Sequence, residues 1–457
     1  TANGPFAFPR ETPDRISYAV QVASQPVNPG QSCTVTNGTG RLAGADITNV
    51  LVACTTLPPD AAGLDLQFAS GGKLSDATLG EARDVAVQAD GKILVVTKTT
   101  LARFLANGSP DTSFGTAGQA ASNFFGASDA LEAVAVQPDG YILVAGSSQD
   151  GANSPTQNDV VVARYDTNGL LDPNFGSGGK VVTDIAGRGD GAYDILLLPD
   201  GRVVVTGTAS IVDSFGITNG DFVAIRYTSS GVLDTSFGTG GFVTTNIAGR
   251  TDLGYAAALQ LDGKIVLAGR VANTGGDDPD IGLVRYTASG ALDTSFGTGG
   301  IVRVLTSDWD EAADVAIQPD GKIVIAGFRL GSTSATPDRL TVMRFDGNGN
   351  ADPGFGTNGR VDDPVMTRGR GIALQTDGRI VVVGGVGEFP SDISVARLNA
   401  IGALDTSFGT GGALRVDFFG GSDEAFAVAI QADGKIVAAG VAQNGTQATM
   451  GLIRVLP

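Results

Sequence analysis

The feature that most constrains this chain is a unit of about 57 residues that occurs seven times after residue 63. One marker of the unit is an apolar run ending in Asp-Gly, with its Asp at positions 90, 139, 200, 262, 320, 377 and 433. A second is Leu-Asp-Thr-Ser-Phe-Gly-Thr-Gly-Gly or a variant, with its Phe at 68, 114, 175, 237, 296, 355 and 408. A third is an apolar strand ending in Arg, at 103, 164, 226, 285, 344, 397 and 454. Three markers with seven copies each predict a sevenfold array.

Each unit has the pattern of four short strands. In the unit spanning 255–300, a small apolar strand at 256–260 meets an Asp-Gly hairpin turn and a branched strand at 264–269. A third strand follows at 281–286 and a fourth at 301–305, and no segment has sustained helical periodicity. A four-stranded antiparallel sheet cannot bury both of its faces alone. Seven sheets standing around one axis cover one another, so we expect an all-β chain whose residues 64–457 form a seven-bladed β-propeller.

The two ends of the repeat array predict how the ring closes. The first unit starts with a strand of the fourth type at 73–79, before any inner strand, and the last unit stops after its third strand. We therefore expect 73–79 to pair beside 452–456 and complete the last blade.

A fixed spacing predicts structural ion pairs. In six units the Asp of the Phe-Gly motif follows the marker Arg by eight residues, and ring closure supplies the seventh Asp from the other end of the chain. We interpret these pairs as supports for the turn after strand three rather than as a site for a carboxylate ligand. The predicted pairs are Arg103–Asp111, Arg164–Asp172, Arg226–Asp234, Arg285–Asp293, Arg344–Asp352, Arg397–Asp405 and Arg454–Asp65.

Charge and composition narrow the function. The net charge of −18 repels phosphate backbones and anionic membrane surfaces, so we expect neither nucleic acid nor membrane insertion. The sequence contains no His, which removes His-based triads, imidazole general bases and His-ligated metals. Metal cations and basic or neutral ligands remain possible partners.

A set of acidic residues is predicted at the mouth of the propeller channel. Ten positions before the Asp-Gly turn, five units carry an Asp, whereas Gly80 and Thr367 stand there in the other two. One interpretation is a carboxylate ring that binds Ca²⁺ or another hard cation. The preferred alternative is that each Asp accepts backbone N–H groups of its own turn. The five residues are Asp129, Asp190, Asp252, Asp310 and Asp423.

Trp309, the single Trp, stands between two aspartates in the same loop region. It could stack on a sugar, although packing against a neighbouring blade is the commoner role of a lone Trp. Together with the five aspartates it completes the candidate ligand site at the channel mouth.

The motifs Gln-Pro-Asp-Gly-Lys-Ile-Val-Ile-Ala-Gly (318–327) and Leu-Asp-Thr-Ser-Phe-Gly-Thr-Gly-Gly (292–300) resemble the bacterial delta-sixty β-propeller repeat. The resemblance covers about residues 64–457. It implies a propeller found in large secreted or surface proteins of bacteria. It implies no catalytic residues.

Residues 1–63 have a different pattern, with alternating strands separated by Gly, Pro and Asn turns. They resemble the C-terminal part of a small immunoglobulin-like module of bacterial surface proteins, which makes them a partial β-sandwich. The only cysteines, Cys33 and Cys54, are expected to form a disulfide, which indicates an oxidising compartment. An incomplete sandwich exposes edges that the propeller, another copy or further surface-protein domains would cover. We therefore expect a fragment or processed product of a longer chain.

These observations lead to a functional expectation. We expect a non-catalytic scaffold, binding or assembly module of an extracellular or cell-surface bacterial protein, with no certain cofactor. The alternatives are a Ca²⁺-dependent glycan binder and a glycan-active enzyme that uses carboxylates alone, because acid–base glycoside chemistry needs no His.

Overall fold

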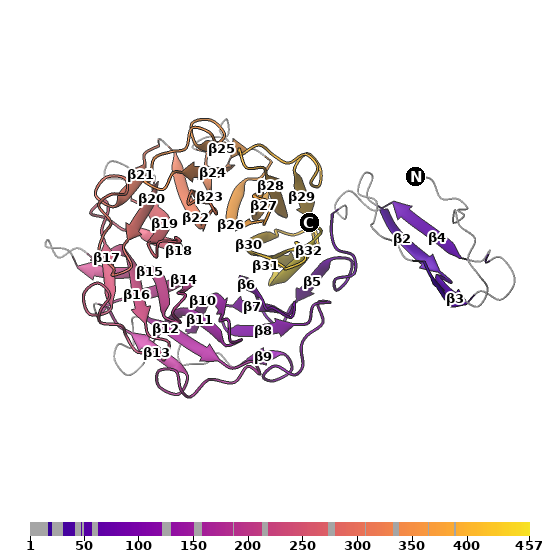
Figure 1. The fold of residues 1–457 in the computed structure, drawn as a ribbon, viewed down its shortest axis with the longest axis horizontal. Coiled ribbons are helices and arrows are strands. Elements are labelled where there is room, and N and C mark those ends of the chain that lie inside the picture. The colour runs from indigo at the N-terminus through magenta and orange to yellow at the C-terminus, as the bar shows by residue number, and fades with distance from the viewer. Residues whose placement is uncertain are drawn as a thin grey trace.

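The fold is a closed ring of seven four-stranded antiparallel sheets, as the sequence predicted (Figure 1). The structure is a computed structural model that describes residues 17–20, 31–41, 47, 50–56, 63–120, 129–149, 158–185, 187–212, 218–272, 279–306, 308–331, 338–363, 365–387 and 390–457. Within these residues every regular element is a strand. Among them, no helix exists that could cross a membrane.

The blades follow one another along the chain, each running from its inner strand to its outer strand. Blade 1 is β6 (Ala82–Val87), β7 (Ile93–Thr97), β8 (Thr100–Phe104) and β9 (Gln119–Ala120), and blade 2 is β10 (Asp129–Val136), β11 (Ile142–Ser148), β12 (Asp159–Tyr165) and β13 (Lys180–Thr183). Blade 3 is β14 (Asp190–Leu197), β15 (Val203–Val212), β16 (Thr218–Tyr227) and β17 (Phe242–Thr245), and blade 4 is β18 (Leu253–Leu259), β19 (Ile265–Val271), β20 (Asp280–Tyr286) and β21 (Ile301–Val304). Blade 5 is β22 (Trp309–Ile317), β23 (Ile323–Leu330), β24 (Arg339–Phe345) and β25 (Arg360–Asp363), and blade 6 is β26 (Arg368–Leu374), β27 (Ile380–Val386), β28 (Asp392–Leu398) and β29 (Ala413–Val416). Blade 7 is β30 (Glu424–Ile430), β31 (Ile436–Asn444), β32 (Gln447–Val455) and β5 (Lys73–Asp76).

Blade 7 confirms the predicted closure. The outer strand β5 pairs antiparallel with β32, so that Leu74 lies opposite Leu452 (Figure 1). The strand ends at Asp76, whereas the sequence predicted a strand to residue 79. Lys73 Nζ also donates a 2.8 Å hydrogen bond to the carbonyl oxygen of Asp417, the residue that follows β29 of blade 6. The first and last parts of the propeller sequence are thus joined in one sheet.

Each inner strand carries a β-bulge at the same place. In blade 4 the register shifts between Gly254 and Ala256, so Tyr255 is the extra residue. The second strand permits this because Gly269 stands opposite, where a Cβ atom would lie 1.9 Å from the carbonyl oxygen of Leu253. A bulge re-aims side chains, and here it presents additional residues to the axis of the ring.

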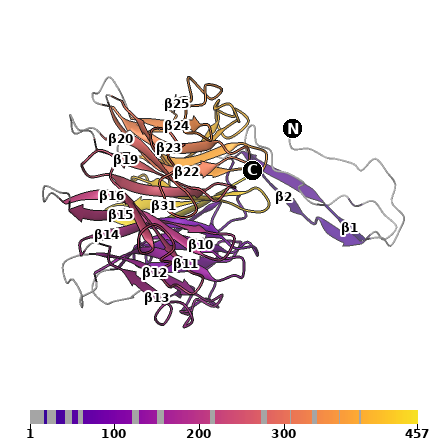
Figure 2. The same cartoon turned by 60° about the vertical axis from the view of Figure 1, so that its left-hand side comes forward.

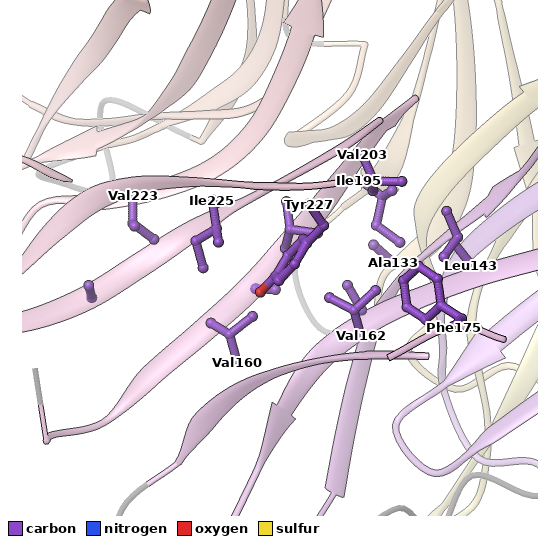
Figure 3. Close-up of a cluster of buried hydrophobic side chains, with 14 residues drawn as sticks. Ala133, Leu143, Val160, Val162, Phe175, Ile195, Val203, Val223, Ile225 and Tyr227 are labelled. Atoms are coloured by element: carbon purple, nitrogen blue, oxygen red, sulfur yellow. The ribbon is translucent and has the colours of Figure 1, made fainter. Parts of the chain in front are cut away.

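The hydrophobic core lies between neighbouring blades. In the cluster of Figure 3, Val162 and Phe175 of blade 2 pack with Ile225 and Tyr227 of blade 3, and all four are buried. Side chains on one face of each sheet therefore pack against the next blade, and those on the other face pack against the preceding blade. This packing removes apolar surface from water on both faces of every sheet.

The N-terminal strands form two small sheets beside the ring (Figure 2). β1 (Ser17–Ala19) pairs with β3 (Thr39–Arg41), and β2 (Gln31–Thr36) pairs with β4 (Leu51–Thr56). The β2–β4 register sets Cys33 opposite Cys54. The disulfide, the immunoglobulin-like classification and the domain boundary at residue 63 stay predictions, and much of 1–63 lies outside the described residues.

Candidate functional site

The marker arginines lie in the joints between blades. In blade 4, Arg285 Nε lies 2.8 Å from Asp293 Oδ2, and its guanidinium carbon lies 4.5 Å from the Phe296 ring centroid. The structure brings all seven predicted Arg and Asp partners to between 2.6 and 2.9 Å. Every one of these arginines also stacks on the Phe of the second marker.

The same arginines reach into the following blade. Arg103 Nη1 and Arg164 Nη1 each donate a 2.6 Å hydrogen bond to a backbone carbonyl, that of Thr167 and of Ser229 respectively. Arg226, Arg285, Arg344 and Arg454 make the equivalent bond. The contacts of these guanidinium groups are therefore contacts that hold the fold together.

The aspartates predicted for the channel mouth are mostly held by backbone amides of their own loops. Asp252 is fully buried, and its carboxylate accepts hydrogen bonds from the N–H groups of Ile247 at 2.7 Å and Ala272 at 3.1 Å. Asp190 and Asp423 accept the equivalent pairs of amides. These are the contacts expected of loop-bracing residues.

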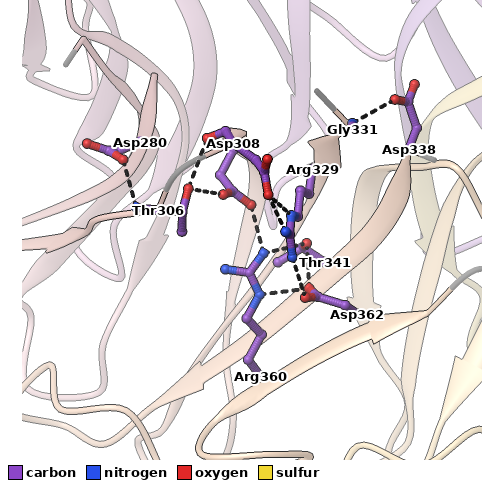
Figure 4. A network of polar contacts seen from close by, with 10 residues as sticks. Asp280, Thr306, Asp308, Arg329, Gly331, Asp338, Thr341, Arg360 and Asp362 are labelled. Atoms are coloured by element: carbon purple, nitrogen blue, oxygen red, sulfur yellow. Dashed lines mark hydrogen bonds and ion pairs between the residues drawn. The ribbon is translucent and has the colours of Figure 1, made fainter. Parts of the chain in front are cut away.

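Two of the five have other partners. Asp129 accepts a hydrogen bond from the Ser148 hydroxyl. Asp310 accepts a 2.8 Å hydrogen bond from Arg360 Nη2 within the polar network of Figure 4. In that network Arg360 also contacts Asp362 at 2.7 Å, and Arg329 pairs with Asp308. None of the five predicted aspartates lines the axial cavity described below.

Among the described residues, two separate groups of three aspartates each bring one carboxylate oxygen per residue to within 4.8 Å of the other two. The groups are Asp159, Asp184 and Asp190, and Asp392, Asp417 and Asp423. Oxygen ligands in such a group suit a hard cation such as Ca²⁺. In the second group Asp392 already pairs with Arg415. Ca²⁺ binding by this chain stays a prediction.

Trp309 packs against the neighbouring blade. The guanidinium carbon of Arg270, on β19, lies 5.5 Å from its ring centroid. Its indole Nε1 is buried and has no hydrogen-bond partner among the described residues. Trp309 does not line the axial cavity either, so the candidate site predicted from sequence is not gathered around it.

The ring encloses a cavity of about 530 Å³, within the roughly 300–1,000 Å³ usual for ligand sites. The bulge residue of every inner strand lines it. These residues differ from blade to blade: Arg83, Glu132, Tyr193, Tyr255, Ala313, Arg370 and Phe426 in blades 1 to 7. The bulges thus set a varied group of side chains around the axis.

Directly after the bulge, blades 1, 3 and 5 carry an Asp that joins two blades. Asp84 accepts a hydrogen bond from the N–H of Val85 at 2.7 Å and, with its other oxygen, from the N–H of Val134 in blade 2 at 2.8 Å. Asp194 bridges to blade 4 and Asp314 to blade 6 in the same way. We call these three residues the inter-blade aspartates. Blades 2, 4 and 6 have Ala133, Ala256 and Gly371 at this position, and blade 7 has Ala427.

The inter-blade aspartates are held in an environment that disfavours their charge. Removal from bulk water is the main cause that raises the pKa of Asp84 to about 7, of Asp194 to about 6 and of Asp314 to about 8. The backbone N–H donors oppose the shift, and the negative charge of Asp194 adds to it for the other two. Carboxyl groups of this kind take up and release protons near neutral pH.

Sequence reasoning missed this cavity for an identifiable reason. It compared the units ten positions before each Asp-Gly turn, whereas the inter-blade aspartates stand six positions before it, and the bulge residues seven. An aligned comparison of those two positions would have found an Asp in alternate units. The bulge itself leaves no plain sequence signal beyond the Gly of the second strand.

Sequence comparison identifies the repeat. The family model described as "Domain of unknown function (DUF5122) beta-propeller" matches more than half of the chain, at residues 88–114, 137–175, 198–237, 260–296, 318–355, 375–408 and 431–457. The matches fall one in each of the seven units. No curated protein sequence matches the chain.

Solved structures are similar in fold alone. The extracellular domain of a putative hybrid two-component system from B. thetaiotaomicron is 11% identical, with a TM-score of 0.42, over 93% of this chain and 44% of that one. A polysaccharide lyase of family PL25, an ulvan lyase, is 13% identical with a TM-score of 0.46 over 86% and 95%. A putative glucose dehydrogenase from Thermus thermophilus is 13% identical with a TM-score of 0.39 over 84% and 100%. The chain thus spans less than half of the first of these proteins.

Proposed function

Because the chain belongs to the DUF5122 β-propeller family, in which no activity is assigned, we propose a function from the site alone. The chain is a non-catalytic binding module of a secreted or cell-surface bacterial protein, and its ligand enters the axial cavity. The opposition of Cys33 and Cys54 in adjacent strands supports an oxidising compartment.

The observation that carries this proposal is the loss of sevenfold symmetry at the bulge. Residues that hold the blades together, such as Arg285 and Phe296, recur in every unit. The bulge residues of the seven units are of five types, with Arg and Tyr each occurring twice, although their backbone is the same. A scaffold needs no such variety, whereas a ligand site needs different side chains at different points of its wall.

A catalytic role fits the inter-blade aspartates less well than a structural one. Both oxygens of each inter-blade aspartate accept backbone N–H groups, one from the same blade and one from the next. A general acid or base needs a carboxyl oxygen within hydrogen-bond reach of the substrate. These carboxyl groups are engaged in joining blades.

The test is to fill the cavity. Ala313→Trp places an indole at the bulge of blade 5, where blades 3, 4 and 7 already accommodate aromatic side chains. Calorimetry is run with three probes of different charge: trimers of glucosamine, N-acetylglucosamine and galacturonic acid. At least one should bind the wild type and lose binding in Ala313→Trp, and the bound sugar should be recovered uncut.

The matched control is Leu261→Trp, at an exposed position on an Asp-Gly turn outside the cavity. It should bind as the wild type does. Binding that survives in Ala313→Trp, or no binding of any probe, contradicts the proposed site. Cleavage of a bound trimer contradicts the non-catalytic role.

A further inference from the structure

The wall of the axial cavity is divided into two unlike halves. Blades 2 to 5, whose inner strands β10, β14, β18 and β22 are consecutive around the axis, contribute Glu132, Tyr193, Tyr255 and Glu311 in that order (Figure 1). Blades 6, 7 and 1 contribute both arginines of the lining, Arg370 and Arg83, together with Phe426 and the carboxylates of Glu424 and Asp84. One half is therefore acidic at its ends and aromatic in its middle.

The two tyrosines form a surface that the protein leaves open. Their ring centroids are 5.7 Å apart with an interplanar angle of 72°, an edge-to-face arrangement. Tyr193 is 36% exposed although it faces the axis. Among the described residues, neither hydroxyl has a hydrogen-bond partner. Aromatic faces attract cations, and their hydroxyls can bond a polar ligand.

The acidic ends are poorly compensated. Glu311 is 8% exposed, lines the cavity and accepts no hydrogen bond within the described residues. Its nearest cation, Arg370 Nη1, is 3.8 Å away, and that guanidinium is already hydrogen-bonded at 2.8 Å to Glu424. Within the part of the chain that the structure describes, the only ion pair of Glu132 is with Arg83, whose Nε lies 3.9 Å from the carboxylate. Burying the carboxylate of Glu311 without hydrogen bonds costs free energy, and Glu132, whose side chain is 26% exposed, can also accept a donor from outside.

We propose that this half of the cavity binds primary ammonium groups carried on a sugar or alkyl body, with charges at Glu132 and at Glu311 and the body against Tyr193 and Tyr255. The inference rests on the proposed function and names its ligand chemistry. An ammonium group supplies the hydrogen-bond donors that the two glutamates lack. The overall charge of −18 favours the approach of a cation.

Binding should be linked to proton release. Removal from water is the main cause that raises the pKa of Glu132 and of Glu311, and nearby cations oppose it. A bound ammonium favours the ionised carboxylates, so protons leave as it binds and affinity increases with pH through their titration. The charged and titratable groups that act on these glutamates or share the wall are Glu81, Arg83, Lys98, Asp84, Asp194, Asp314, Arg270, Arg368, Arg370, Glu424, Tyr193 and Tyr255.

The experiment compares matched ligands by calorimetry at about pH 6, where the amine is charged. The glucosamine trimer should bind at least about tenfold tighter than the N-acetylglucosamine trimer, which has the same body without the charge. Spermidine tests the ammonium on an alkyl body. Glu311→Gln and Glu132→Gln should each weaken the preferred amine roughly ten- to hundredfold. Buffers of different ionisation enthalpy should reveal net proton release.

The control variant is Asp320→Asn, which removes a carboxylate from the exposed Asp-Gly turn of blade 5, outside the cavity lining. It should change affinity less than about twofold. Amine binding unaffected by both Gln substitutions at the wall, or absent altogether, overturns the inference. If the N-acetylated trimer binds equally well and Ala313→Trp abolishes its binding, the cavity is a ligand site and only the ammonium inference fails. Spermidine alone binding would assign the alkyl amine as the source.

Discussion

The joints between blades and the wall of the axial cavity are built from the same repeat, yet they differ in one respect. At the joints, Arg, Asp and Phe recur in all seven units with nearly constant geometry. At the wall, the bulge residue is cationic, acidic, aromatic or small depending on the blade. The difference teaches that repetition in this chain marks the residues that keep the ring together. Variation at a fixed backbone position marks those that meet a ligand.

The largest expected effect is at a joint. Arg285→Ala removes the close ion pair with Asp293, the stacking on Phe296 and the bond to blade 5, and it leaves Asp293 with Lys264, at 3.3 Å, as its cation. We expect a loss of about 3–5 kcal/mol in the free energy of unfolding, measured by urea denaturation. Arg250→Ala, at an exposed loop position, should stay within about 0.5 kcal/mol of the wild type. A loss below about 1 kcal/mol for Arg285→Ala would remove the distinction between joint and wall.

An intermediate effect is expected from pH. Because the folded pKa of Asp314, about 8, lies above its unfolded value of 3.8, the protonated form favours folding. This contribution is fully present below about pH 4 and is lost as pH rises through 8. Asp314→Asn should reduce the fall in stability between pH 5 and 9 by roughly 1–3 kcal/mol, since each pKa unit is worth about 1.4 kcal/mol and water in the channel reduces the effect.

Slopes rather than absolute stabilities are compared here, because an Asn side chain keeps only one of the two acceptors that Asp314 offers to Val315 and Ile372. The control is Asp200→Asn on an exposed turn. A hydrogen bond from Arg202 is the main cause that lowers the pKa of Asp200, so its contribution is lost only on acidification. It should leave the slope between pH 5 and 9 unchanged. An unchanged slope in Asp314→Asn would show that this carboxyl titrates normally.

The smallest effect on stability is expected at the wall. Tyr193→Ala loses an edge contact with Tyr255, worth about 0.5–1.5 kcal/mol, and little else. Tyr227→Ala is the same change at a fully buried position between blades 2 and 3, and it should cost about 3–5 kcal/mol. Urea midpoints of the two variants measure the contrast directly. Equal losses would mean that Tyr193 also serves the fold.

The sequence predicted the joints because their signals are local and repeated. An eight-residue spacing between Arg285 and Asp293 spans one turn, and seven copies remove coincidence. Closure by β5 could be predicted because the strand count at the two ends is complementary. A ligand site at the channel was predicted, but its lining was not, since the residues that line it are far apart in sequence and the positions six and seven before each Asp-Gly turn were not compared. The aspartates at positions such as Asp252 were found by their repetition, and their backbone partners are those of a loop brace.

The inter-blade aspartates alternate with small residues around the axis, and seven is an odd number. Asp and a small residue cannot alternate perfectly around a ring with an odd number of blades, because two neighbouring blades must then carry the same kind of residue. One defect is unavoidable, and it falls where Gly371 and Ala427 are neighbours. A ring of six or eight sheets could have had a channel with several equivalent orientations. With seven blades, the side of the channel between blades 6 and 7 differs from every other side. A ligand in the channel therefore meets an asymmetric wall that can fix its orientation.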